Sequence, residues 1–257
     1  TAVKAQLWHE RFTGSVAASP DEAAAGADLI VVCVGDDDDL TEVLTGAHGV
    51  IHAVKPGALV VDHSTVSAAC ARALYESFKE KNTGFVDAPV SGGQAGAQNG
   101  VLTVMAGGNK ADYLLLKDLI TNCYTKEFRY MGPAGSGQLT KMVNQVCIAG
   151  VLQGLAEGLA FGLKAGLDMD DVLAVLREGA AQSWQLENRG KTMVRDEFDF
   201  GFALEWMVKD LKIVLAEAEQ KGCRMDVTRL VLEYYQDLQT RGFGRLDTSA
   251  LIKRLTA

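Results

Sequence analysis

The chain has 257 residues, of which 48% are hydrophobic and 23% charged, and its formal net charge is -8. This length allows one large domain or two ordinary ones, and the composition is that of a globular protein, which excludes a disordered or collagen-like chain. The negative net charge and the lack of a cluster of basic residues argue against a nucleic-acid partner, because affinity for nucleic acid comes from clustered Lys and Arg.

The first half alternates strand-like and helix-like segments. Short β-branched runs, apolar on both faces, predict strands at 29–34, 59–62, 85–88, 102–106 and near 127–130. Helix-forming composition predicts helices at 21–25, 40–44, 66–78 and 110–119. Because strands that are apolar on both faces are typical of a covered parallel sheet, this half is predicted to be an open α/β sheet.

From Gly137 onward the pattern changes. Apolar, helix-permissive segments without a strand pattern lie at 139–163, 169–176, 206–222, 228–241 and 248–255. The glycine-rich stretch GPAGSG at 132–137 predicts the junction between the two halves. The sequence therefore predicts a Rossmann-type α/β domain over 1–133 and an all-helical domain over 134–257, with a ligand site in the cleft between them.

Polar residues that follow the predicted strands are the first candidates for a site, because ligands bind at that edge of an α/β sheet. Ser91, Gly92 and Gly93 offer a hydroxyl and successive backbone N–H groups, which suit a carboxylate or phosphate oxygen. A tight strand-to-helix turn accounts for the tripeptide equally well.

The segment GPAGSGQLTKMVNQ at 132–145 is a glycine loop that opens a helix. Gly137, Lys141 and Asn144 share one face of that helix, so Gly137 is expected to leave room for a ligand at which the other two point. A lysine in an apolar helix loses solvation, which favours the neutral amine that proton transfer needs. The alternative is a surface lysine that snorkels past a core face.

Several motifs together resemble the 3-hydroxyisobutyrate dehydrogenase family, the β-hydroxyacid dehydrogenases that are similar to 6-phosphogluconate dehydrogenase. They are VDHST at 61–65, FVDAPVSGG at 85–93, GVLTVMAGG at 100–108, GPAGSGQLTKMVNQ at 132–145 and MVKDL at 207–211. The resemblance implies hydride transfer between NAD or NADP and a small 3-hydroxyacid or its semialdehyde, with Lys141 as the general acid/base.

The resemblance also implies a role for other residues. The substrate carboxylate or hydroxyl would be held by Ser91, Gly92, Gly93 and Asn144, with Phe202 in the pocket and Asp210 close to Lys141. The cofactor would be approached by Val34, Gly35, Thr65 and Lys209. One departure is visible, because the family usually has Leu-Pro where this chain has Val34-Gly35, followed by four aspartates.

The start of the chain also departs from the usual dinucleotide-binding pattern. Residues 1–12 look like the middle of a helix, and no GxGxxG occurs. Such a sheet normally opens with a strand, that fingerprint and a helix facing the pyrophosphate. We therefore expect a further segment before Thr1, and the choice between NAD and NADP would depend on residues there.

Metal binding is not predicted. His48 and His52 lie four residues apart, but no carboxylate accompanies them as in a zinc protease. The run of aspartates at 36–39 lacks the glycine and distal glutamate of a calcium loop, so a solvated turn is expected.

Location and assembly follow from the remaining patterns. Five scattered cysteines favour a reducing compartment, the cytoplasm or the mitochondrial matrix. Longer apolar runs such as 29–34 are far below the ~20 residues of a membrane span, so no membrane partner is expected. The segment 139–163 is apolar nearly all round, which predicts a homodimer or homotetramer.

Two other functions are compatible with the same fold. An imine reductase shares the architecture but usually lacks a lysine at the position of Lys141. A non-catalytic oligomerisation module of this fold would have the catalytic lysine replaced. The presence of Lys141 favours the dehydrogenase over both.

Overall fold

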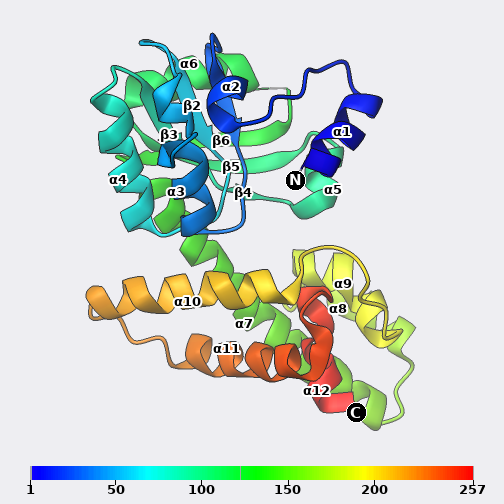
Figure 1. The fold of residues 1–257 in the computed structure, drawn as a ribbon. Coiled ribbons are helices and arrows are strands. Elements are labelled where there is room, and N and C mark those ends of the chain that lie inside the picture. The colour runs from blue at the N-terminus through cyan, green and yellow to red at the C-terminus, as the bar shows by residue number, and fades with distance from the viewer. Residues whose placement is uncertain (1, 122, 257) are drawn as a thin grey trace. The chain divides into compact units, whose positions relative to one another are not determined.

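A computed structural model describes residues 2–121 and 123–256 (Figure 1). They form two compact units. The sheet unit comprises the described residues up to Ser91 together with Gly100–Lys141, and the helical unit comprises Gly92–Asn99 and the described residues from Met142 onward. The predicted fold class, a Rossmann-type α/β domain followed by a helical domain, is confirmed.

The described part of the sheet unit contains six strands in one sheet. They are β1 (Leu29–Val32), β2 (Leu59–Asp62), β3 (Gly84–Asp87), β4 (Val90–Ser91), β5 (Leu102–Gly108) and β6 (Thr125–Gly132). Their order is β1-β2-β3-β5-β4, with β6 paired to β5. Strands β1, β2 and β3 are parallel and in register, so their carboxyl ends lie at one edge.

The expectation of a parallel sheet is wrong beyond β3, because β5 runs antiparallel to both β3 and β4. Strands β3 and β4 pair with β5 in one continuous register, from Val86 opposite Gly108 to Ser91 opposite Thr103. Pro89 separates the two strands because it has no N–H for the ladder, although its carbonyl still accepts from the N–H of Met105 at 3.1 Å.

Alternating residues of the strands supply two apolar cores, one on each face of the sheet. Ile30, Val60 and Phe85 pack with α3 and α4, while Val61 and Val86 pack with α6. The helices of this unit are α1 (Ala2–Arg11), α2 (Pro20–Ala24), α3 (Asp37–Thr45), α4 (Ala68–Lys79) and α6 (Lys110–Ile120), with a short 3-10 turn at Val50–His52. This two-sided burial explains why the strands are apolar on both faces.

The helical unit packs around the long helix α7. Its helices are α5 (Gly93–Gln98), α7 (Ser136–Lys164, which begins in the sheet unit), α8 (Met169–Glu178), α9 (Trp184–Val194), α10 (Leu204–Gln220), α11 (Asp226–Leu238) and α12 (Lys253–Thr256), with irregular turns at Gln239–Phe243 and Thr248–Ile252. Helices α10 and α11 run side by side (Figure 1).

Helix α7 is long and apolar enough to cross a membrane by length and composition, so the expectation of only strand-sized apolar runs is wrong for this segment. A helix in the core of a globular protein can have the same length and composition. Leu152, Ala156 and Leu159 of α7 are buried in the core of the helical unit. Packing within that unit covers one part of the apolar surface of α7.

Candidate active site

The loops that follow β1 and β2 are joined at the carboxyl edge of the sheet. The backbone N–H of Val34 donates to Oγ of Ser64 at 2.9 Å. Gly35 follows Val34, and Thr65 follows Ser64, so three residues predicted to lie on the cofactor side are brought to one edge of the sheet unit. Thr65 is half-buried there.

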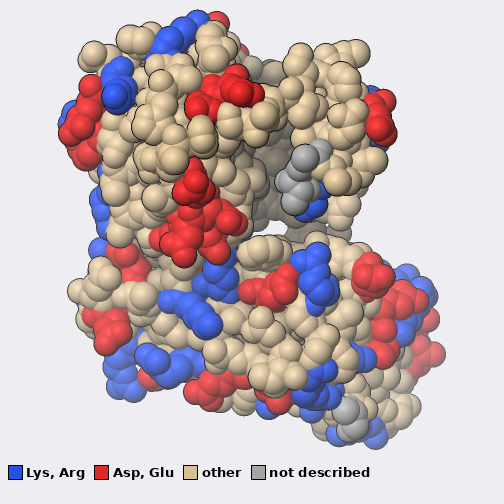
Figure 2. Space-filling view, in the orientation of Figure 1, with Lys and Arg blue, Asp and Glu red and all other residues tan. Residues whose placement is uncertain are grey.

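The acidic run at 36–39 begins α3 and is not a solvated turn. Asp36 accepts from the N–H of Asp39 at 2.9 Å, and Asp37 accepts from the N–H of Ser67 at the start of α4 at 2.8 Å. Carboxylates are favourable at helix N-termini, where backbone N–H groups are unpaired. Figure 2 shows the acidic side chains gathered over α3. Among the described residues, no group of three or more potential ligands has the arrangement of a metal site.

Lys141 lies in the second turn of α7, in the sheet unit. Its Nζ donates to the carbonyl of Val90 at 2.9 Å, and only 8% of the residue is exposed. The alternative of a surface lysine therefore does not describe it. Val90 precedes Ser91 in β4, so this contact brings the lysine beside one predicted substrate residue.

The tripeptide Ser91-Gly92-Gly93 forms the turn between β4 and α5. Gly92 has φ 128° and Gly93 has φ 62°, a backbone region that favours glycine because it has no side chain. The turn interpretation of this segment is confirmed. It leaves the half-buried Ser91 hydroxyl at the end of β4.

Gly137 has a different role from the one expected. A Cβ at this position would lie 2.4 Å from the carbonyl oxygen of Met105 and 2.5 Å from that of Asp87. The missing side chain allows α7 to approach β3 and β5 closely. Backbone atoms of these strands, rather than a ligand, occupy the space beside Gly137.

Asp87 is a buried carboxylate at the end of β3 that sequence reasoning did not select. It accepts from the backbone N–H of Gly135 at 2.7 Å and of Gln138 at 3.0 Å. Burial raises the pKa of Asp87 to about 6, although these backbone N–H groups act to lower it. The signal available in the sequence was its place directly before the loop that contains Ser91.

A second group of predicted residues lies in the helical unit. Nδ2 of Asn144 donates to Oε1 of Gln145 at 2.8 Å, and Nε2 of Gln145 donates to Oδ2 of Asp210 at 2.7 Å. Oδ1 of Asp210 lies 3.2 Å from Nζ of Lys209. Gln145 therefore connects Asn144 to the buried Asp210. No pattern in the sequence had singled out Gln145.

Phe202 is half-buried and packs against the apolar core of the helical unit. Its backbone N–H donates to Oδ2 of the buried Asp247 at 3.0 Å. Arg189 pairs with the same carboxylate at 3.0 Å, and its guanidinium lies over the ring of Trp184 at 5.1 Å. These contacts fix the backbone at Phe202.

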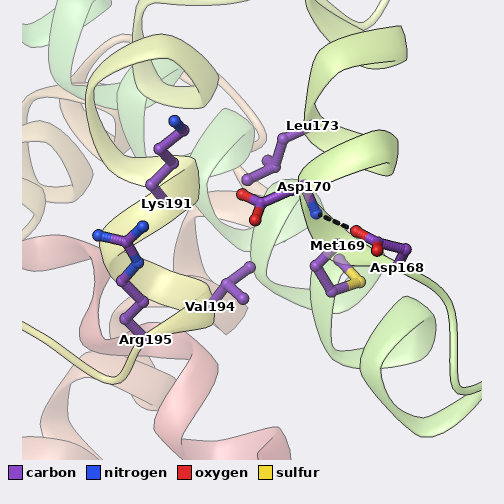
Figure 3. Close-up of a pocket in the computed structure, with 7 residues that line it drawn as sticks. All are labelled: Asp168, Met169, Asp170, Leu173, Lys191, Val194 and Arg195. Atoms are coloured by element: carbon purple, nitrogen blue, oxygen red, sulfur yellow. Dashed lines mark hydrogen bonds between the residues drawn. The ribbon is translucent and has the colours of Figure 1, made fainter.

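A shallow hollow of about 370 Å³ also lies in the helical unit. Figure 3 shows Lys191 and Arg195 on one side of it and Asp170 on the other. Asp168 accepts from the N–H of Asp170 at 3.0 Å, which caps α8. This hollow contains none of the residues predicted from the sequence to bind substrate or cofactor.

Both halves of the chain match known family descriptions. Residues 1–132 match the NAD binding domain of 6-phosphogluconate dehydrogenase, and residues 135–255 match the NAD-binding of NADP-dependent 3-hydroxyisobutyrate dehydrogenase. Together with the Rossmann-type sheet, these matches define an oxidoreductase that uses NAD or NADP.

Individual relatives narrow the family. The chain is 51% identical over 255 residues to an uncharacterised oxidoreductase of Shewanella frigidimarina, covering 99% of this chain and 87% of that protein. It is 32% identical over 234 residues to the 2-hydroxy-3-oxopropionate reductase of Escherichia coli, covering 91% and 80%. The crystal structure of 3-hydroxyisobutyrate dehydrogenase from Salmonella typhimurium matches with a TM-score of 0.83 at 31% identity, over 92% and 82%. The chain belongs to the 3-hydroxyisobutyrate dehydrogenase family of NAD(P)-dependent hydroxyacid dehydrogenases.

Proposed function

We propose that this enzyme interconverts a small 3-hydroxyacid and its semialdehyde, with Lys141 as the general acid/base. The observation that carries the proposal is the burial of Lys141 beside β4, where its Nζ is held 2.9 Å from the Val90 carbonyl. A buried amine held next to a polar loop is a candidate for proton transfer, because such a group can be kept within hydrogen-bond reach of the substrate oxygen.

Lys141 exchanges one proton with the substrate oxygen. During oxidation the neutral amine accepts the hydroxyl proton while the C–O bond becomes C=O. During reduction the ammonium returns a proton to the carbonyl oxygen. When bound, NAD or NADP provides the nicotinamide carbon that takes up or gives the hydride. The Val90 carbonyl accepts one N–H of Lys141 in both directions, which orients the amine beside β4.

The residues at the carboxyl edge fit the cofactor assigned by the family. After β1, Val34 is followed by Gly35, which has no side chain and so leaves the backbone open to approach. After β2, Thr65 carries a hydroxyl. The Val34 to Ser64 hydrogen bond keeps these segments together. We assign these three residues to the nicotinamide side and Lys209 of the helical unit to a further contact with the cofactor.

The substrate carboxylate is assigned to Ser91, Gly92 and Gly93, whose turn places a hydroxyl and backbone N–H groups in succession. Asn144, three residues after Lys141 on α7, is assigned to the substrate from the helical unit, with Asp210 and Phe202. The ion pair between Lys209 and Asp210 orients both side chains for these roles.

Replacement of Lys141 tests the proposal. Lys141→Ala is expected to lower kcat for short 3-hydroxyacids by about 10²- to 10⁴-fold, because positioned acid–base catalysis contributes that much. Binding of NAD and NADP, followed by the fluorescence of the reduced cofactor, should change little. Lys117→Ala, an exposed lysine on α6, is the matched control.

The same assay separates the alternatives. Turnover of Lys141→Ala within a few-fold of the unmodified enzyme would contradict the assignment. Faster reduction of cyclic imines than of semialdehydes would favour an imine reductase, and cofactor binding without turnover of any substrate would favour a non-catalytic module.

We place the enzyme in the cytoplasm, where its scattered free cysteines stay reduced.

A further inference from the structure

Gln138 extends the contacts of Asp87 to the loop after β2. Its backbone N–H is held by Asp87, while its side chain donates to the carbonyl of Ser64 at 2.9 Å and accepts from the N–H of Val66 at 3.2 Å. Both Asp87 and Gln138 are almost fully buried. The first turn of α7 is therefore fixed to β3 and to the loop that contains Thr65.

Two contacts join the same pair of segments. Asp87 binds the backbone at Gly135, directly before α7, and at Gln138 in its first turn. Lys141, one turn later, binds the carbonyl of Val90, three residues after Asp87. A shift of α7 along the strand would stretch both contacts. The position of the Lys141 amine therefore depends on the position of the first turn of α7.

The carboxylate of Asp87 is closely surrounded. A Cβ at Gly107 would lie 2.6 Å from its Oδ1, and a Cβ at Gly137 would lie 2.8 Å from its Oδ2. Glycine at both positions allows the strand and the helix to approach the carboxylate from two sides. Asp87 has little room for another rotamer, so it can act as a fixed anchor.

We propose that Asp87 is a positioning residue, whose ionised carboxylate anchors the start of α7 so that Lys141 reaches both the Val90 carbonyl and the substrate oxygen. The proposal rests on the proposed role of Lys141 as the acid/base. Asp87 itself transfers no proton to the substrate, and acts through the backbone of α7.

Protonation of Asp87 would loosen this anchor. Because burial raises its pKa to about 6, Asp87 takes up a proton as the pH falls through about 6, and a neutral carboxyl accepts backbone N–H groups less strongly. The titratable or charged groups nearest to it come from neighbouring elements. They are Asp62 of β2, His63 of the following loop, Arg72 of α4, which lies beside Gly135, and Lys141 of α7.

The test compares Asp87→Asn with the unmodified enzyme and with Asp112→Asn, a half-buried carboxyl on α6 of the same unit. We expect Asp87→Asn to lower kcat by about 10- to 100-fold with a much smaller change in KM, because small displacements of a catalytic group cost this much. Asp112→Asn should have the kcat and the KM of the unmodified enzyme.

The pH profile of semialdehyde reduction distinguishes anchoring from general instability. In this direction Lys141 supplies a proton, so a fall in rate on the acidic side is not explained by that lysine. A fall in kcat below pH about 6 is expected for the unmodified enzyme and for Asp112→Asn. Asp87→Asn should lack that fall.

Amide hydrogen exchange supplies a readout that does not depend on activity. Backbone amides of residues 135–141 should exchange faster in Asp87→Asn and at an unchanged rate in Asp112→Asn. Unchanged kcat, or unchanged exchange in this segment, would overturn the proposal. If Asn is not tolerated at position 87, amide exchange of the unmodified enzyme above and below pH 6 decides, with the intrinsic pH dependence of exchange removed, and unchanged protection of residues 135–141 is the contrary result. An active Lys141→Ala would instead refute the proposed function.

Discussion

Ser91 and Asn144 supply polar groups to the proposed site from different elements. Ser91 ends β4, and Asn144 lies on α7 beside Gln145. Loss of either group would leave a substrate oxygen without its partner, which costs about 1–3 kcal/mol. Ser91→Ala and Asn144→Ala should therefore each raise KM by roughly 5- to 160-fold, since 1.36 kcal/mol is a factor of ten.

Steady-state kinetics with a series of short 3-hydroxyacids measure this effect. Ser77→Ala is a suitable control, because Ser77 is a half-buried serine on α4 whose hydroxyl donates to the carbonyl of Ala73 within the same helix. Unchanged KM values in both site variants would remove these residues from the substrate site.

The sequence indicated the residues that are chemically distinctive and missed those that act through position. Lys141 stands out because a charged amine is unusual in an apolar helix, and Ser91 stands out because its hydroxyl precedes two glycines. Asp87 was not selected, because its partner Gly135 lies 48 residues away in the chain. That contact exists only once α7 packs on the sheet, and no local pattern predicts it.

At the level of elements, the start of α7 depends on close backbone contacts. A methyl group at Gly137 would meet the carbonyl oxygens of Met105 and Asp87, which belong to the backbone and cannot rotate away. Gly137→Ala is therefore expected to destabilise the protein by about 1–3 kcal/mol, the usual cost of overpacking.

Chemical denaturation of Gly137→Ala and Gly179→Ala measures this difference. Gly179 ends α8 with φ -106°, and a Cβ there would lie 3.7 Å from its nearest neighbour. Gly179→Ala should be neutral or stabilising by about 0.4–1 kcal/mol, because alanine restricts the unfolded chain. Equal stabilities of the two variants would contradict the close approach of α7 to the strands.

Elements with a regular pattern were predicted best. The predicted segments 59–62 and 169–176 correspond closely to β2 and α8. The sequence did not indicate α9, whose first turns combine Trp184 with polar residues, because only Leu186 and Met193 of its buried positions carry a large apolar side chain. The antiparallel direction of β5 was also missed, because it depends on pairing with β3 and β4 across the intervening residues 92–101.

For the whole molecule, the exposed face of α7 supports the prediction of a homodimer or homotetramer. Val143 is 64% exposed and Phe161 is 73% exposed. Between them, Cβ atoms added at Gly150, Gly154 and Gly158 would have no neighbour within 4 Å. An apolar face with glycines of this kind allows a second helix to pack closely.

Light scattering at micromolar concentration measures the assembly. The unmodified protein should have the mass of a dimer or tetramer, and Phe161→Asp should shift it toward monomer because a charge is costly in an apolar interface. Val227→Asp, at an exposed position on α11, should leave the mass unchanged. A monomeric mass for active unmodified protein would contradict the prediction.

The position of β1 at the border of the sheet has a consequence for how chains associate. Within residues 2–121 and 123–256, β1 pairs only with β2, and Val31 on its exposed side is 51% accessible. The backbone of such a border strand is a template for another chain. Pairing of β1 with the β1 of a second chain would be two-fold symmetric, because each chain offers one such strand, and it would join chains only in pairs. A charged residue in place of Val31 would disfavour this edge-to-edge contact, so comparing the mass of that variant with the unmodified protein separates it from an interface at α7.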